Sequence, residues 1–229
     1  MTSQPKKAND FQLHIDEINQ LSRTVTSNVI ALAESGKTEK KKAIDDAIDD
    51  IEDMLIMGYL EGFYGTYDEL YGTDLVDTKS MNLDISDSEI ESKDAPTIDI
   101  DKLLNALNAE IGGKTYIDRI RQHMEDGEYN LVNRVVETEF HRLYNMGGMD
   151  CVSDFAPKSD AKVIVTKKWY TMRDEKVRET HNYLDGMKLN IDERFYTFDG
   201  DSALYPSDFA NPENNINCRC ILLYATENI

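Results

Sequence analysis

One long apolar stripe constrains the fold of this chain more than any other feature of its sequence. Between residues 38 and 63, apolar side chains recur at the three- and four-residue spacing of an α-helix, while four aspartates occupy the opposite face. The stripe consists of Ala43, Ile44, Ala47, Ile48, Ile51, Leu55 and Tyr59. The acidic face consists of Asp45, Asp46, Asp49 and Asp50. The pattern predicts an amphipathic helix over residues 38–63, closed by the tyrosine-rich segment 62–72.

Helical spacing recurs in other parts of the first 150 residues. Apolar periodicity predicts a helix over residues 11–33, a short helix over 99–111, a continuation over 117–124 and a strong helix over 128–146. Glycine pairs separate or end these segments. Gly112 and Gly113 divide the two short helices, and we expect Gly147 and Gly148 to stop the last one.

The sequence changes character after residue 148. β-branched residues in partial alternation predict strands over 161–171 and 187–191, and the apolar segment 218–225 predicts a final strand. Asp174 is a suitable N-cap for a short helix that ends before Gly186. The expected fold class is therefore α+β, with a mostly helical N-terminal part followed by a small α+β C-terminal module with a few short strands.

An acidic segment interrupts the helical part. Residues 74–96 lack apolar periodicity and have the composition of a linker or a mobile loop. We therefore expect an N-terminal helical region over residues 1–72, an acidic linker over 73–97, a second helical region over 98–148 and a C-terminal α+β domain over 149–229.

The charge balance bears on the kind of partner. The chain has 25 Lys and Arg against 44 Asp and Glu, a formal net charge of −19. Binding to nucleic acid through counterion release needs clustered basic side chains, so we expect any contact with DNA to be weak. An acidic surface suits a basic protein partner or simply solubility. No stretch approaches the roughly 18 apolar residues of a membrane helix and no signal core follows the N-terminus, so we expect no membrane partner and synthesis in a cytoplasm.

Two cysteines near the C-terminus and one histidine are the strongest candidates for chemistry. Cys218, Cys220 and His181 carry donor atoms that suit zinc. Candidates for a fourth ligand are Cys151, His141 and Asp185. In a strand the two thiols of a C-x-C pair point to opposite faces, so both could bind one ion only where the strand bends. Buried, reduced cysteines and a disulfide are the alternatives that the sequence leaves open.

The same residues also allow a catalytic interpretation. In a helix, Asp174, Arg178 and His181 at i, i+4 and i+7 would share one face, where Asp174 could pair with Arg178. Cys218 or Cys220 could then act as a nucleophile with His181 as its base, oriented by Asp174 or Asp185. These residue types are common, so their presence alone does not establish catalysis.

The order of the motifs in the last hundred residues is more specific than any one of them. W-x-T, D-x-x-x-R-x-x-H and L-D-G are followed by D-E-R-F, a proline-containing loop and I-N-C-R-C, and a T-E-x-x-R-x-x-N helix precedes them. This order resembles the C-terminal domain of the phage minor head protein family, the head morphogenesis or Mu F-like domain. The resemblance extends over about residues 133–223. The matched positions are Thr138, Glu139, Arg142, Asn145, Trp169, Thr171, Asp174, Arg178, His181, Asp185, Gly186, Phe195, Pro206, Asn217, Cys218, Arg219 and Cys220.

The resemblance implies a virion component of a tailed phage or prophage. Such a protein associates with the portal protein and with capsid or scaffold components, is assembled in the host cytoplasm, and acts in head morphogenesis and in DNA packaging or ejection. The resemblance implies that the motif residues hold a loop-rich module together, with or without zinc at His181, Cys218 and Cys220. The structural motif positions are Trp169, Asp174, Arg178, Asp185, Gly186 and Asn217.

The resemblance also bears on catalysis. We expect no catalytic residue, and the alternative function is a metal-assisted or Cys/His hydrolase or nuclease acting on nucleic acid. Some family members are fused to toxin enzymes. Because only five residues follow Tyr224, we expect no such fusion here.

Overall fold

The computed structural model of the chain describes residues 37–71, 97–110, 113–155 and 163–228, together with 16, 17, 20, 23, 24 and 26–31. Almost all of the predicted linker over 73–97 lies outside these residues, as does much of the predicted helix over 11–33. Within that helix, residues 26–31 are helical and Val29 is buried.

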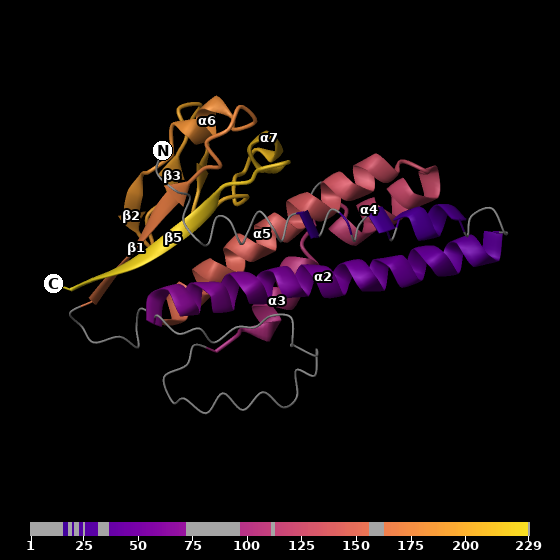
Figure 1. Ribbon diagram of the computed structural model, residues 1–229, viewed down its shortest axis with the longest axis horizontal. Coiled ribbons are helices and arrows are strands. Elements are labelled where there is room, and N and C mark those ends of the chain that lie inside the picture. The colour runs from indigo at the N-terminus through magenta and orange to yellow at the C-terminus, as the bar shows by residue number, and fades with distance from the viewer. Residues whose placement is uncertain are drawn as a thin grey trace.

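Two long helices form the body of the molecule (Figure 1). Helix α2 (Lys37–Tyr71) lies along helix α5 (Tyr129–Phe155), and the two make the most extensive contact between any elements of the fold. The predicted stripe of α2 is buried along its whole length, from Ala43 to Tyr59. The predicted end of this helix at residue 63 was wrong. The helix continues to Tyr71 because Thr66 and Tyr67 are also buried and extend the same packed face.

The glycine pair of α5 does not end that helix, which runs on to Phe155. A Cβ atom on Gly147 would lie 2.1 Å from the backbone oxygen of Tyr59, and one on Gly62 would lie 1.9 Å from that of Tyr144. No real Cβ approaches a backbone oxygen so closely, so these glycines allow α2 and α5 to touch backbone to backbone. The predicted stop at Gly147 and Gly148 was therefore wrong, because close packing rather than a turn requires glycine there.

Two shorter helices cover the long pair. Helix α3 (Ile100–Leu107) has Asp99 as its N-cap, whose side chain accepts from the Lys102 amide, and it buries Leu103 and Leu107. Leu104 is half exposed. Helix α4 (Tyr116–Asp126) opens with a capping box between Thr115 and Asp118 and ends at Gly127, which has a φ of 76°. Its inward side chains are Tyr116, Ile120 and Met124.

The C-terminal module contains one three-stranded antiparallel sheet. Strand β1 (Val163–Tyr170) lies between β2 (Lys188–Asn190) and β5 (Ile221–Asn228), giving the order β2-β1-β5. In this register Trp169 lies opposite Leu222. The strands β3 (Phe195–Tyr196) and β4 (Ser202–Ala203) form a separate ladder, and α6 (Glu179–Asn182) and α7 (Pro212–Asn215) are single turns. The α+β class is confirmed.

Two local predictions in this module were wrong. The helix expected from Asp174 begins only at Glu179, because the residues before it form a turn in which Asp174 accepts from the Lys176 amide. The last strand begins at Ile221 rather than at Cys218, because Asn217 has a φ of 55° and turns the chain before the sheet starts.

The sheet rests on the helical pair through shared apolar packing. β5 contacts both α2 and α5. Tyr170 and Ile221 belong to the apolar cluster of the helices, while Met149 and Val152 of α5 belong to the cluster of the module. Within the described parts of the chain, none of the helices combines the length and the apolar composition of a membrane span.

Candidate functional site

The predicted zinc donors lie together in the core of the C-terminal module. The sulfur of Cys218 is 3.6 Å and that of Cys220 is 3.5 Å from Nδ1 of His181. All three side chains are buried, and one donor atom from each lies within 4.8 Å of the others. Among the described residues this is the one such group of three or more His, Cys, Asp or Glu side chains. We call it the Cys–His cluster.

The loop before β5 lets both thiols face the same imidazole. Because the strand begins only at Ile221, Cys218 and Cys220 do not alternate across a sheet as they would in a strand. The left-handed backbone of Asn217 starts the turn, and the Cys218 amide donates to the Asn215 carbonyl at 3.1 Å. The bend that the sequence required for a shared site is therefore present.

Aromatic rings fix the orientation of His181. Its ring is stacked on Phe209 with centroids 5.3 Å apart, and it meets Trp169 edge-on at 5.8 Å. Phe195 closes the other side of Trp169 at 5.0 Å. With Nδ1 directed at the sulfurs, Nε2 is buried and has no hydrogen-bond partner among the described residues. The imidazole is thus held by apolar walls and by its contacts with the two thiols.

A second histidine anchors the cysteine loop from the helical part. Nε2 of His141, on α5, lies 2.6 Å from the carbonyl oxygen of Cys220, and Nδ1 lies 2.8 Å from the hydroxyl of Ser207. This network assigns the proton to Nε2, which donates to the carbonyl, while Nδ1 accepts from the serine. Burial lowers the pKa of His141, so the ring stays neutral. Asn145 donates to the same Cys220 carbonyl at 3.4 Å.

The two thiols differ in acidity. Burial tends to raise the pKa of the Cys218 thiol, but its interactions with Cys220 and His181 outweigh burial and bring the pKa well below its usual value. Burial and the neighbouring Cys218 raise the pKa of Cys220. The indole N–H of Trp169 has no hydrogen-bond partner among the described residues. Its proximity to the Cys220 sulfur opposes the rise in the pKa of that thiol. A first negative charge therefore forms more readily on Cys218.

The polar motif residues hold the loops around the cluster, although not in the predicted pairs. Asp174 makes a bidentate ion pair with Arg219, at 2.7 and 2.8 Å, rather than pairing with Arg178. Arg178 instead donates to the carbonyl of Ile216. Because Asp174 lies in a turn outside α6, it does not share a helical face with His181. The hydrogen bonds from Arg219 are the main reason why the pKa of Asp174 lies below its usual value.

Asp185 and Gly186 fasten the end of β1. Oδ1 of Asp185 accepts from the amide of Thr171 at 2.9 Å and from its hydroxyl at 3.1 Å, and Oδ2 accepts from Arg173. Gly186 has a φ of 82°, and its amide donates to the Trp169 carbonyl at 2.9 Å. Asp185 thus joins the end of β1 to the turn after α6, 14 residues later in the sequence.

None of the three predicted candidates for a fourth ligand belongs to the Cys–His cluster. Asp185 is occupied by Thr171 and Arg173, and both ring nitrogens of His141 are occupied as described. Cys151 is buried in the apolar cluster of the long helices. Asp185 and His141 are therefore engaged elsewhere, and Cys151 packs in a different apolar cluster from Cys218 and Cys220.

Two important side chains were missed at the level of sequence. His141 was considered only as a ligand, although its place in α5 opposite the cysteine loop makes it an anchor. Lys167 of β1 is fully buried and donates to the carbonyls of Ile191 at 2.7 Å and Leu204 at 2.9 Å. Strand alternation could have found it, because Lys167 falls between Val165 and Trp169 on the buried face.

A small cavity adjoins the Cys–His cluster. Its volume is about 10 Å³, and its lining residues are Lys176, Val177, Arg178, His181, Asn217, Cys218, Arg219 and Cys220. Such a volume holds about one water molecule. The donor set can bind a thiophilic metal ion, but the cavity has no room for an organic substrate beside it.

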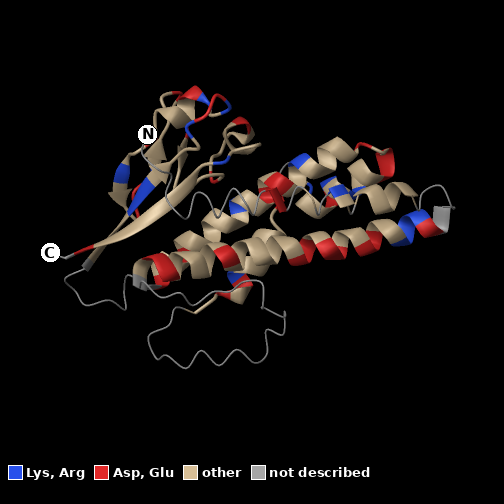
Figure 2. Cartoon of the chain, in the orientation of Figure 1, with Lys and Arg blue, Asp and Glu red and all other residues tan. Residues whose placement is uncertain are grey.

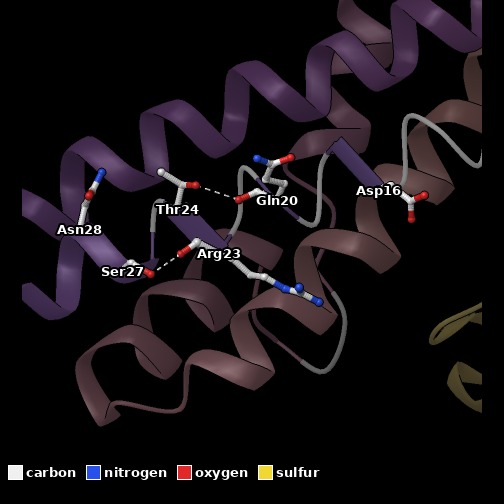
Figure 3. A pocket seen from close by; sticks show the side chains of 6 residues that line it. All are labelled: Asp16, Gln20, Arg23, Thr24, Ser27 and Asn28. Carbon is white, nitrogen blue, oxygen red and sulfur yellow. Dashed lines mark hydrogen bonds between the residues drawn. The ribbon is translucent and has the colours of Figure 1, made fainter.

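A larger hollow lies elsewhere, on the N-terminal segment. It measures about 600 Å³ and shares no lining residue with the Cys–His cluster (Figure 3). Its hydroxyls are used within the segment itself: Thr24 donates to the Gln20 carbonyl and Ser27 to that of Arg23. Its lining is ordinary polar helix surface, so the buried cluster is the better candidate site despite the smaller cavity.

Comparison with known proteins gives one family and two relatives. The family model described as Phage Mu protein F like protein matches residues 100–223, more than half of the chain. Minor head protein GP7 of Bacillus phage SPP1 is 32% identical over 90 residues, which cover 39% of this chain and 28% of that protein. A protein of Enterococcus faecalis named NAD(+)--arginine ADP-ribosyltransferase EFV is 24% identical over 264 residues, covering 96% of this chain and 51% of that protein. The chain thus spans about half or less of these relatives, and no solved structure matches it.

Proposed function

Because the chain belongs to the phage Mu protein F-like family, we propose that it is a minor head protein of a tailed phage or prophage. In this role it associates with the portal protein and other head components in the host cytoplasm, becomes part of the virion, and acts in head assembly and in DNA packaging or ejection. The observation that carries the proposal is the family match over residues 100–223, together with the relative named as a minor head protein.

The construction of the matched region supports a structural role. Its polar side chains join loops to strands and helices. The Asp185 carboxylate accepts from the Thr171 amide, and His141 bonds the Cys220 carbonyl. Burial of His181, Cys218 and Cys220 also fits a scaffold better than an open active site. A rigid module on a long helical pair is a suitable part for a multiprotein shell.

Helix α2 offers the surface that we propose for a partner. Its outer side carries a row of carboxylates, visible as the red bands along α2 in Figure 2. Asp46, Asp49, Asp50 and Asp53 are all exposed. A row of like charges attracts a basic partner surface and speeds its association, and salt weakens that attraction. We therefore assign the acidic face of α2 to contact with the portal or a scaffold component.

The proposal is tested by the protein content of capsids. After induction of the phage or prophage that encodes the chain, mature heads and procapsids are purified and analysed by mass spectrometry. We expect the chain in both, at fewer copies than the major capsid protein, and co-purification with the portal protein of the same phage. Its absence from purified heads, with the protein present in the lysate, would contradict the proposal.

The surface assignment has its own matched variants. The substitutions Asp49→Asn, Asp50→Asn and Asp53→Asn together remove three charges from α2. The control Glu175→Gln, Asp192→Asn and Glu213→Gln removes three exposed charges from the C-terminal module. We expect the first triple variant to lose portal association and the control to keep it. Equal loss in both variants would show that only total charge matters.

We do not extend the enzymatic name of the Enterococcus faecalis relative to this chain. The cavity beside the Cys–His cluster has room for about one water molecule, which disfavours a hydrolase, a nuclease or a Cys/His nucleophile at that site. Purified protein should therefore neither cleave DNA nor transfer ADP-ribose from NAD+ to arginine residues of a test protein. Activity above that of a heat-denatured sample in either assay would overturn this part of the proposal.

A further inference from the structure

We propose that His181, Cys218 and Cys220 bind one zinc ion, with a water molecule in the adjoining cavity as the fourth ligand. The site goes beyond the proposed role in the phage head and is independent of it, because it rests on the geometry of three side chains rather than on a partner.

The distances in the Cys–His cluster match the edges of a zinc tetrahedron. With Zn–S bonds of about 2.3 Å and Zn–N bonds of about 2.0–2.1 Å, tetrahedral angles place sulfur and nitrogen about 3.6 Å apart. The observed separations between Nδ1 of His181 and the two sulfurs are 3.6 and 3.5 Å. Two of the three edges among the donor atoms therefore have the length that a shared ion requires, and the third, between the two sulfurs, is within 4.8 Å.

The surroundings hold the donor atoms in this arrangement. The Cys220 carbonyl is fixed by His141, the Cys218 amide is bonded to Asn215, and the His181 ring lies between Phe209 and Trp169. Because the second histidine anchors the loop through the backbone, the Cys220 side chain is directed at the imidazole. A site whose ligands are positioned by other residues loses little conformational entropy when the metal binds.

The weak polar contacts of the buried imidazole give a further reason to place an ion at Nδ1. Nε2 of His181 is buried and has no partner among the described residues. The polar contacts of the ring are therefore those of Nδ1 with the two sulfurs. Thiols are weak hydrogen-bond partners and compensate a buried polar ring poorly. A metal–nitrogen bond at Nδ1 would offset the burial of the ring better than two thiols do, and it would leave the ring proton on Nε2.

The choice of zinc follows from the donor chemistry, and the choice of water from the space available. Two thiolates and one imidazole are the ligands that zinc prefers, and together with Zn²⁺ they form a site without net charge. Since Cys151, His141 and Asp185 are not in the cluster, the fourth position falls to the cavity of about 10 Å³. That cavity admits one water molecule.

The position of the site in the fold indicates what the ion would do. His181 belongs to α6, which follows β1, whereas the cysteines lie directly before β5. A zinc ion would therefore join two loops of the module that are 37 residues apart in the sequence at His181 and Cys218. Three protein ligands and one water are the usual coordination of catalytic zinc, but the adjoining cavity has no room for a substrate, so the ion would stabilise the module.

The test begins with the metal content of the full chain. Protein purified under reducing conditions is analysed by elemental mass spectrometry, and we expect one zinc per chain. Replacement by Co²⁺ should give the strong visible bands of a tetrahedral ion and a thiolate-to-cobalt charge-transfer band. A strong chelator should lower the melting temperature. Folded protein that binds neither ion, or a Cys218–Cys220 disulfide in the reduced preparation, would overturn the proposal.

Variants show whether these residues are the ligands. Cys218→Ser and Cys220→Ser should each lose the bound zinc, while the control Cys151→Ser, which alters a buried cysteine outside the cluster, should keep it. If a serine variant fails to fold, alkylation of the wild type serves instead. Zinc should protect Cys218 and Cys220 from alkylation and leave the reactivity of Cys151 unchanged. Zinc retained at full occupancy in both serine variants, or equal protection of all three cysteines, would contradict the assignment.

Discussion

A buried lysine supports the loops of the C-terminal module. Lys167 is fully buried in β1, donates to the carbonyls of Ile191 and Leu204, and has its ammonium group 5.4 Å from the ring centre of Phe195. Burial lowers its pKa to about 8, because the charged form loses its water. One side chain thus links three segments at the cost of keeping a charge in the interior.

The lysine makes stability depend on pH in a specific direction. Between pH 8 and about 10.4 the unfolded chain binds a proton at Lys167 that the folded chain has released, so stability increases with pH over that interval. We expect the unfolding free energy of the wild type to rise relative to Lys167→Met from pH 8 upward, with a slope of up to about 1.4 kcal/mol per pH unit. Urea titrations of both proteins from pH 7 to 9.5 measure the difference. A constant difference would mean that the lysine titrates normally.

Asp201 organises the loop between β4 and α7. Its carboxylate accepts from the amides of Ser202, Ala210 and Asn211 and from the side chain of Asn214. Burial tends to raise the pKa of Asp201, but these hydrogen bonds outweigh burial and hold the pKa below its usual value. The carboxylate therefore stabilises the loop most in its charged form.

Replacement of this carboxylate should cost stability at neutral pH and matter less in acid. Asp201→Asn removes acceptors from backbone amides, so we expect a loss of about 1–3 kcal/mol at pH 7. Because the folded pKa is the lower one, the wild type loses this contribution as the pH falls through that value, and the two proteins should converge below about pH 4. The exposed Asp192→Asn is the control and should change little. An Asp201→Asn protein as stable as this control at pH 7 would refute the role of the carboxylate.

At the scale of elements, the contact between α2 and α5 depends on glycine. Gly62 faces the backbone of Tyr144, and Gly147 faces that of Tyr59. Backbone atoms within a packed helix cannot move aside as a flexible side chain can. The distance between the two helix axes is therefore set by the absence of a Cβ at these positions.

Single alanine substitutions should separate packing from helix propensity. We expect Gly62→Ala or Gly147→Ala to lower the unfolding free energy by more than about 3 kcal/mol, since the added methyl group overpacks the contact. Gly65→Ala is the matched control on α2, because nothing lies within 4 Å of its Cβ position. It should be neutral or stabilising by up to about 1 kcal/mol through helix propensity. Urea unfolding followed by circular dichroism compares them, and equal stability of the Gly62 and Gly65 variants would disprove the close contact.

The same glycines show how far sequence reasoning reaches. The periodicity of α2, the start of a helix near Asp99 and the strands around Trp169 and Leu189 follow from local patterns, and these predictions were confirmed. A glycine pair reads locally as a stop, whereas at Gly147 the backbone of another helix gives it a different role. Local sequence cannot reveal that role, because the facing Tyr59 lies 88 residues earlier in the chain.

The candidate site was predicted in part for a similar reason. The residue types identified His181, Cys218 and Cys220, and the structure brings them together. The pairing of Asp174 depended on a helix that does not form, because its carboxylate is used by a local turn and by Arg219. The anchor His141 could not be assigned from spacing alone, since it lies 79 residues from the carbonyl that it fixes.

At the scale of the whole molecule, the helices and the C-terminal module share their cores. Tyr170, Met172 and Ile221 of the module pack in the cluster of the long helices, and Met149 and Val152 of α5 pack in the cluster of the module. The predicted domain boundary at residue 148 stays a prediction, and it lies within α5. Two bodies that exchange core residues in this way have little reason to unfold separately.

This interlocking predicts a single cooperative unfolding transition. Trp169 is the one tryptophan of the chain and lies in the core of the module, so its fluorescence reports on the module, whereas far-ultraviolet circular dichroism reports mainly on the long helices. Coincident transitions by two probes are expected when both parts unfold together. Urea titrations should therefore give one midpoint by both methods, and Gly62→Ala, a change confined to the helical contact, should shift both curves equally. If the fluorescence midpoint stayed in place while the circular dichroism midpoint moved, the module would be an independent domain, and the predicted boundary would describe a real division of the chain.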